Sequence, residues 1–466
     1  MKHRRASPPF CNARRLLLLV VIIVTSIVFT YNYSFLRRTA AADGAAAASP
    51  SSPRNVESAP HRSSLPDDGD VPVVLIPCDC SAYSDWQSVI VVRSLQHVRR
   101  QFGQKFRIRR LISCNEPERL VPLFRSLGAD ADEDMDVNPV TVALGDPYPH
   151  PPMRGFVYPP LNKPHAVSEW LASEAAAGLS NATEIFIVDP DFLFLDRLPL
   201  GASRMGEPAA SGTYSIGANW YLAPDSPVRH FCRGECGHPT AVDILERFDI
   251  GAPYAIRLGD LRRLTPYWLN MTEEMVLAAD LATAWSTPGG WLCEMYAFSM
   301  AAMRTNLPHT RHHDWMVYVP GHLTSVPATV ATPVALHFCQ QYDFSHVTDA
   351  YSAKFNKHDF HDRGERIVLS CDEATVVNSV FRRHGWKVPD IFQKVGRPWI
   401  NGSTAWPGPM PSLPPPQSRD VEASFLREQW FLYSIYYHFS LILGEFREQA
   451  CEDGRVDVTR RIFTDM

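Results

Sequence analysis

The chain has 466 residues and a formal net charge of −5 at pH 7. Its first 38 residues carry seven Lys or Arg and no acidic residue, which leaves −12 for the remainder. An acidic body without a basic tract excludes nucleic-acid binding as a function.

An uncharged segment lies close to the N-terminus. Leu16 to Leu36 are 21 consecutive residues without a charge, long enough to cross a bilayer as a helix. The heavier basic cluster lies upstream, so residues 1–15 are expected in the cytosol and the rest in the lumen. A cleaved signal peptide is the alternative, but no clear small-x-small cleavage site precedes Arg37. The sequence therefore predicts an uncleaved signal anchor over residues 16–36.

Residues 37–70 predict a flexible stem. From Thr39 onward they are rich in Ala, Ser and Pro and contain no Phe, Trp or Tyr. Such a segment cannot bury enough apolar area to order itself. Three acceptor sequences for N-glycosylation follow, at Asn181, Asn270 and Asn401, and they fit a lumenal domain.

The cysteines fit the same compartment. Nine of the ten lie beyond the anchor, where disulfides persist. Cys78/Cys80 and Cys232/Cys236 invite a zinc interpretation, but their CxC and CxxxC spacings differ from a paired C-x2-C pattern. We therefore predict disulfides rather than a zinc site, without a connectivity.

Residues 71–406 are long enough for a large single domain or for two tightly joined halves. Segments of apolar β-formers alternate along it with segments of helical apolar spacing. This alternation predicts a layered α/β fold with a mostly parallel sheet. The expected strands are 71–77, 107–113, 140–144 and the segment ending at Asp189, and the expected helices are 84–102, 165–179 and 291–303.

The apolar run of residues 184–195 is broken once, by Asp189-Pro190-Asp191. Two carboxylates beside a buried strand carry a desolvation cost, for which a hard divalent cation is the usual compensation. Ligands of parallel sheets bind beyond the carboxyl ends of strands, which is where these carboxylates are expected. Asp-x-Asp after a strand therefore suggests a nucleotide-sugar site, with an ordinary turn as the alternative.

Glu294 is the one acidic residue in the apolar helix expected over residues 291–303. It has a structural interpretation, in which an arginine or the helix macrodipole stabilises it. It also has a functional one, as a carboxylate with a tuned proton affinity that acts as a base or binds a sugar hydroxyl. The preceding Pro-Gly-Gly favours the functional interpretation.

Histidines and lysines supply further candidates. His337 ends the apolar run Val330 to Leu336, and with Asp-x-Asp it would suit Mn²⁺, although a lone His beside a strand is more often structural. His309, His312, His313 and His322 match no zinc motif. The nearby Pro308 and Pro320 suggest loops, so these histidines are expected to be solvated or supporting residues. Lys163 and Lys357 are candidates to meet phosphates, with an ordinary surface position as the alternative.

Two segments close the chain. Residues 407–420 are rich in proline and predict a linker. Residues 421–466 are expected to form a helical extension around the 14 mostly apolar residues 430–443. That stretch is short for a second membrane span, so we expect a helix packed on the domain or on a partner.

Four blocks resemble the hydroxyproline O-arabinosyltransferase family and the related peptidyl serine α-galactosyltransferases. The resemblance covers most of residues 71–400, and the order and spacing of the blocks carry it. They are residues 161–165 (LNKPH) leading to 187–191 (IVDPD), 266–272 (PYWLNMT), 290–297 (GWLCEMYA), and 337–342 (HFCQQY) followed by 354–360.

The resemblance implies a type II membrane protein of the Golgi or endoplasmic reticulum with a GT-A-like fold. It implies transfer of a sugar from a UDP-sugar to hydroxyproline of secreted glycoproteins, with arabinofuranose as the leading candidate sugar. The implied cofactor is Mn²⁺ or another divalent cation. Asp189 and Asp191 would bind the metal diphosphate, His337 would complete the metal site, and Glu294 would face the acceptor or the sugar. Transfer of galactose to serine is the alternative.

Two other classes stay open. A lumenal glycoside hydrolase would use Asp189 and Glu294 as its carboxylate pair. A membrane-anchored sugar-binding protein would keep the fold without the chemistry. The anchored layout with Asp-x-Asp after an apolar strand favours the transferase.

Overall fold

A computed structural model describes residues 71–79, 82–113, 140–144, 159–203, 209–213, 219–222, 229–277, 292–318, 332–339, 341–343 and 354–356, and six residues between 430 and 442. The chain divides into two units, Met1–Leu65 and Pro66–Met466, and all of these residues belong to the second. None of the helices described in them is long and apolar enough to cross a membrane. The predicted cytosolic tail, anchor, stem and linker lie outside the described residues, as do Lys357, His322 and Asn401.

Seven strands form the main sheet. They are β1 (Val73–Asp79), β2 (Arg107–Ser113), β3 (Val140–Leu144), β4 (Glu184–Ile187), β6 (Ala209–Thr213), β7 (Ile250–Arg257) and β8 (His309–His312). Their order is β3-β2-β1-β4-β7-β6-β8. Pairing is parallel from β3 to β4 and between β6 and β8, and antiparallel on both sides of β7. The sheet is therefore rich in parallel pairs, as the alternating strands and helices predicted, but the antiparallel pairing of β7 makes it a mixed sheet.

Short strands form two smaller sheets. They are β5 (Phe192–Phe194), β9 (Met316–Val317), β10 (Ala335–His337), β11 (Gln341–Asp343) and β12 (Lys354–Asn356). Strand β10 lies between β5 and β9, antiparallel to β5 and parallel to β9, and β11 pairs with β12. The register of β10 on β5 sets His337 opposite Phe192, next to the Asp-x-Asp break.

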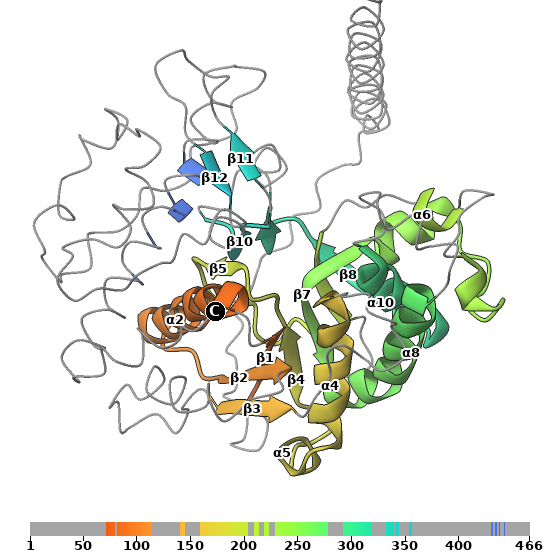
Figure 1. The fold of residues 1–466 in the computed structure, drawn as a ribbon, viewed down its shortest axis with the longest axis horizontal. Helices are drawn as coiled ribbons and strands as arrows, with labels where there is room; N and C mark the ends of the chain where they lie inside the picture. Colours follow the sequence, from red (N-terminus) through yellow and green to blue (C-terminus); the bar gives the residue numbers. More distant parts are fainter. Residues whose placement is uncertain are drawn as a thin grey trace, which may run out of the picture. The chain divides into compact units, whose positions relative to one another are not determined.

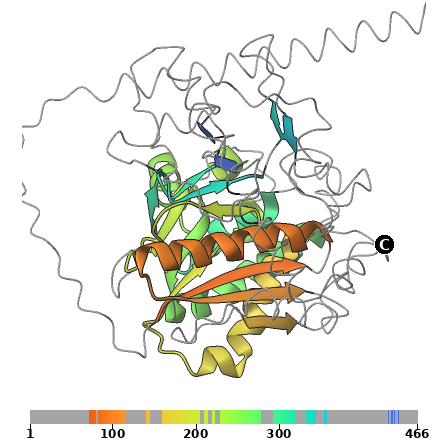
Figure 2. The same ribbon diagram turned by 90° about the vertical axis from the view of Figure 1, so that its left-hand side faces the viewer.

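Helices cover both faces of the main sheet. The long ones are α2 (Ala82–Phe102), α4 (Asn162–Ala172), α8 (Leu258–Leu277) and α10 (Cys293–Arg304). Helix α2 packs on β1 and β5 from one side, and α4, α8 and α10 pack together on the other side (Figure 1 and Figure 2). Short helical turns connect these elements: η3 (Pro159–Leu161), α5 (Glu174–Ala177), α6 (Asn219–Leu222), η4 (Arg229–Cys232), α7 (Ala241–Asp243) and the π-helical η5 (Ile244–Phe248).

The core lies between the sheet and its two helical layers. Strand β1 is buried along nearly its whole length, as expected of a parallel strand covered on both faces. Trp170 of α4 and Trp268 of α8 are among the largest fully buried side chains. Burial of such side chains stabilises a domain by roughly 1.5–3 kcal/mol each. Helices α4 and α8 are therefore firmly attached to the domain core.

Two expected elements differ from the structure. The helix expected over residues 165–179 begins earlier, at Asn162, and is interrupted at Ser173, whose amide and hydroxyl both donate to the carbonyl oxygen of Trp170. The loop expected at His309 to His312 is strand β8, and His309 is buried rather than solvated. Pro308 precedes this strand, and its carbonyl accepts the amide of Ala209, so it starts the pairing with β6 instead of preventing it.

Cys232 and Cys236 form a disulfide, which confirms the disulfide interpretation of that pair. The other pair is described only at Cys78, whose sulfur accepts a hydrogen bond of 3.0 Å from Arg110 Nε. Cys80 lies outside the described residues.

The described residues near the C-terminus are helical. They are Trp430, Phe431, Ser434, Ile435, His438 and Ile442, all buried, and they recur at helical spacings of three or four residues with two adjacent pairs among them. The four apolar ones belong to the same hydrophobic core as the sheet. One face of this segment therefore packs on the domain.

Candidate active site

The two aspartates follow the strand that joins the parallel and antiparallel parts of the sheet. Strand β4 pairs in parallel with β1 on one side and antiparallel with β7 on the other. The amide of Val188 extends the pairing by donating to Leu75 O at 3.0 Å, and the chain then turns through Asp189-Pro190-Asp191 into β5. Apolar residues on both sides of the turn are buried, and they attach the turn to the core at the end of β4.

Asp191 is held by His337, which lies 146 residues further along the chain. His337 Nε2 lies 3.0 Å from Asp191 Oδ1, and the amide of Phe338 donates to the backbone carbonyl of Asp191 at 3.0 Å. The imidazole stacks on Phe192, with ring centroids 4.6 Å apart. Both side chains of the pair are buried, so strand β10 fixes the carboxylate of Asp191 in one position.

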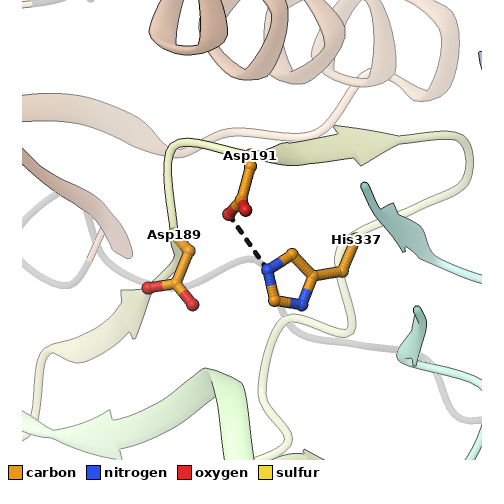
Figure 3. A group of neighbouring side chains, drawn as sticks. All are labelled: Asp189, Asp191 and His337. Atoms are coloured by element: carbon orange, nitrogen blue, oxygen red, sulfur yellow. Dashed lines mark hydrogen bonds and ion pairs between the residues drawn. The ribbon is translucent and has the colours of Figure 1, made fainter. Parts of the chain in front are cut away.

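Asp189, Asp191 and His337 together form a group that can hold a metal ion. Each offers one ligand atom, and these atoms all lie within 4.8 Å of one another. Figure 3 shows the three side chains side by side, two from the β4–β5 turn and one from β10. Two carboxylate oxygens and an imidazole nitrogen suit a divalent cation such as Mn²⁺. The donor set therefore fits a divalent metal ion, as the sequence predicted.

Lys163 lies between two carboxylates. Its Nζ is 2.6 Å from Asp189 Oδ1 and 3.0 Å from Glu294 Oε2. The lysine comes from the first turn of α4, and Glu294 from the first turn of α10. Lys163 is thus mostly buried in an ionic bridge, rather than the ordinary surface lysine of the alternative interpretation.

Glu294 is almost completely buried in the first turn of α10, the position that the structural interpretation allowed, and its cationic neighbour is a lysine rather than an arginine. Trp268 Nε1 donates to the backbone carbonyl of Glu294 at 3.1 Å, which attaches the start of α10 to α8. Burial raises the pKa of Glu294 to about 6, although Lys163 acts in the opposite direction. A carboxyl group with this pKa can exchange a proton near neutral pH.

Each aspartate of the turn has a cationic partner within the protein. Burial alone would lower the pKa of Lys163, but Asp189 and Glu294 outweigh burial and raise it, so the ammonium stays charged. Burial likewise opposes protonation of His337, but Asp191 and Cys339 outweigh it and raise its pKa to about 10. His337 would have to be neutral to bind a metal ion, so metal binding would release its proton.

Tyr254 is a neighbour of the site that the sequence did not reveal. It lies on β7 opposite Ile187 of β4, is completely buried, and stacks on Phe298 with ring centroids 3.9 Å apart. Burial and the charge of Glu294 raise the pKa of its hydroxyl well above the ordinary value, despite the opposing charge of Lys163. Tyr254 therefore stays neutral within electrostatic reach of the Lys163 bridge. The alternation of strand 250–257 could have placed it on this face only after the pairing with β4 was known.

The chain is similar to a known protein family and to several characterised proteins. The Hydroxyproline O-arabinosyltransferase family N-terminal domain matches residues 73–312, just over half of the chain. The Peptidyl serine alpha-galactosyltransferase of Arabidopsis thaliana is 28% identical over 308 residues, which cover 64% of this chain and 32% of that protein. Hydroxyproline O-arabinosyltransferase NOD3 of Pisum sativum is 28% identical over 191 residues, 40% of this chain and 51% of that protein. This chain thus spans about a third to a half of these relatives.

Among solved structures, galactosyltransferase LgtC in complex with donor and acceptor sugar analogs matches 57% of this chain and 87% of its own. The TM-score is 0.32 and the sequence identity is 12%.

The fold and the site define an α/β protein with a candidate metal centre at the carboxyl end of a central strand. With the family domain matching residues 73–312, the chain belongs to the hydroxyproline O-arabinosyltransferase family.

Proposed function

We propose that this chain is a metal-dependent glycosyltransferase that moves a sugar from a UDP-sugar to hydroxyproline of secreted polypeptides, with arabinofuranose as the first candidate sugar. The observation that carries the proposal is the group Asp189, Asp191 and His337 at the end of β4. Membership of the family, whose domain ends at residue 312, supports the reaction class independently of His337. A GT-A-like nucleotide-sugar-binding fold is part of the proposal.

The proposed roles follow from the contacts. Asp189, Asp191 and His337 would hold the divalent cation, Mn²⁺ in the first instance, and Lys163 would add positive charge beside Asp189. When bound, the cation would stabilise negative charge on the departing diphosphate. Asp191 has its position set by His337 and by the backbone of Phe338, and a fixed ligand is what such stabilisation needs.

Glu294 is proposed to face the acceptor or the sugar. Its raised pKa suits a group that accepts a proton from an attacking hydroxyl near neutral pH. Lys163 connects it to Asp189, so the acceptor side and the metal side share one ionic network.

The same bridge disfavours the glycoside hydrolase. In that class the sugar and a water molecule, or the sugar alone, lie between two carboxyl groups. Here the Lys163 ammonium lies between the two carboxylates, paired with Asp189 and hydrogen-bonded to Glu294.

Serine galactosylation is the second candidate. The serine galactosyltransferase of Arabidopsis thaliana matches 64% of this chain, against 40% for NOD3, at the same identity. The two candidates share the metal centre and differ in donor sugar and acceptor residue.

The compartment is also proposed rather than observed. The uncharged residues 16–36, preceded by basic residues, would anchor the chain as a type II protein of the Golgi or endoplasmic reticulum membrane. The disulfide between Cys232 and Cys236 fits a lumenal domain.

A donor and acceptor screen tests the proposal. Purified full-length chain is incubated with UDP-arabinofuranose, UDP-galactose and other UDP-sugars, each with a hydroxyproline peptide and a matched serine peptide, in Mn²⁺ or in EDTA. We expect transfer of arabinofuranose to the hydroxyproline peptide, detected by mass spectrometry and abolished by EDTA. Transfer of galactose to serine would select the second candidate. UDP binding without transfer to either peptide would favour the non-catalytic sugar-binding protein.

A further inference from the structure

Lys163 and a metal ion would use the same carboxylate. The ammonium forms an ion pair with Asp189 Oδ1 at 2.6 Å, close enough for direct contact between the two charges. Asp189 is also one of the three ligands of the candidate metal centre. The lysine is held on its other side by Glu294 Oε2 at 3.0 Å. Asp189 is therefore already paired with a cation, the Lys163 ammonium, in the absence of a metal ion.

We propose that Lys163 competes with the divalent cation for Asp189 and that Glu294 holds the lysine while the metal is bound. The pair would then determine how tightly the site retains its metal. This inference rests on the metal centre of the proposed function.

Burial makes the competition strong. The side chains of Lys163, Asp189 and Glu294 are 12%, 18% and 3% exposed, so water screens their charges poorly. An ammonium and a divalent cation that share one carboxylate repel each other, and the repulsion increases as the effective dielectric constant falls. A lysine at this position should therefore weaken metal binding, the opposite of what a neutral side chain of the same length would do.

Glu294 gives the lysine a second position. When a metal ion attracts the carboxylate of Asp189, Lys163 can keep its contact with Glu294 and remain charge-paired. Without Glu294 the ammonium would depend on Asp189 alone and would hold it more tightly. Removal of the lysine and removal of the glutamate charge should thus change metal affinity in opposite directions.

A purely structural bridge would behave differently. Lys163 and Glu294 also connect α4 to α10, so either substitution is expected to lower stability. If the bridge served only to connect the helices, both variants would lose stability, and metal affinity would stay the same or fall in both. The signs of the two changes distinguish the two roles.

The test measures Mn²⁺ binding to the full-length chain without nucleotide, by the loss of the free-ion electron paramagnetic resonance signal during titration. Lys163→Met keeps the length of the side chain and removes its charge, and Lys163→Arg keeps the charge as the matched control. We expect Lys163→Met to bind Mn²⁺ about tenfold tighter or more, and Glu294→Gln to bind it several-fold more weakly. Lys163→Arg should stay within about threefold of the unmodified chain. In Lys163→Met, the additional change Glu294→Gln should have little further effect, because the lysine that it acts through is gone.

Circular dichroism establishes that each variant is folded. If Lys163→Met does not fold, Lys163→Gln and the single variant Glu294→Gln still test the two expected directions. Unchanged or weaker Mn²⁺ binding in the neutral lysine variants overturns the inference. The proposed metal centre would still stand in that case if the unmodified chain binds Mn²⁺ and Asp191→Asn does not. Absence of Mn²⁺ binding in both the unmodified chain and Lys163→Met overturns the metal centre and this inference with it.

Discussion

His337 Nε2 lies 3.0 Å from Asp191 Oδ1, although 146 residues separate the two in the sequence. The contact depends on strand β10, which pairs antiparallel with β5 and sets His337 opposite Phe192, the residue after Asp191. A short strand far along the chain thus supplies the third candidate ligand to a turn that already carried two.

Replacement of Asp191 should remove the metal site. Asp191→Asn keeps the shape of the side chain and removes its charge. Loss of a residue that only supports a metal ligand typically lowers metal affinity about 10–100-fold. For loss of a ligand itself we expect Mn²⁺ affinity to fall by at least about 100-fold. Isothermal titration calorimetry with Mn²⁺ measures this. Asp260→Asn, on the surface of α8, is the matched control and should bind Mn²⁺ like the unmodified chain. Equal binding by Asp191→Asn would contradict the assignment.

The buried His309 should make stability depend on pH. Burial lowers its pKa to about 4 from an ordinary value of 6.5. The hydrogen bond that its Nδ1 donates to Leu307 O at 3.1 Å acts in the opposite direction but is the smaller effect. Between pH 6.5 and about 4 the unfolded chain binds a proton here and the folded chain does not, so acid destabilises the fold. The expected loss from this residue is about 1.4 kcal/mol for each pH unit in that interval, and it is complete below pH 4.

Urea unfolding from pH 4 to pH 7 measures this slope. His309→Asn cannot titrate, so its slope should be shallower by the contribution of one histidine. His438, whose pKa burial also lowers to about 4, should add a slope of its own that remains in His309→Asn. Equal slopes in the unmodified chain and in His309→Asn would show that His309 is not buried in its neutral form.

Glu184 should stabilise the loop that follows β5. Its two carboxylate oxygens accept the amides of Gly201 and Ser203, each at 2.7 Å. In Glu184→Gln one amide would face an NH₂ group instead of an acceptor. We expect a loss of about 1–3 kcal/mol in the free energy of unfolding.

Urea unfolding measures that loss, with Glu174→Gln on the exposed face of α5 as control. The control should stay within about 0.5 kcal/mol of the unmodified chain. A loss of the same size in both variants would mean that the contacts of Glu184 add nothing specific.

The disulfide between Cys232 and Cys236 should stabilise the loop that contacts α8 and α10. Within this loop Arg233 pairs with Glu274 of α8 at 2.7 Å, and Glu235 pairs with Arg304 of α10. The bridge closes a short loop, so its removal in Cys232→Ser/Cys236→Ser should cost about 2 kcal/mol. Thermal unfolding measures the loss, and a reducing agent should lower the stability of the unmodified chain more than that of the double variant. Equal sensitivity to the reductant would indicate that other bridges dominate.

Much of the fold could be predicted from local patterns. The strands at residues 107–113 and 140–144 lie where their sequences predicted, because β-branched and other apolar residues favour the extended conformation of a strand. The errors arose at a proline and a serine, because each of these residue types is compatible with more than one local backbone structure. Pro308 begins a strand instead of extending a loop, and Ser173 interrupts a helix by bonding back to Trp170.

The sequence by itself determined that two carboxylates follow a buried strand, because residue type and apolar patterning are local properties. It also singled out Lys163, Glu294 and His337 as candidates. Only the tertiary structure decided which of them meet: His337 with Asp191 through β10, and Lys163 with both Asp189 and Glu294 where α4 and α10 pack on the sheet. Tyr254 joined them only through the pairing of β7 with β4. The physical reason is that a charge interaction depends on distance through space, and strand pairing and helix packing set that distance between residues that the chain keeps far apart.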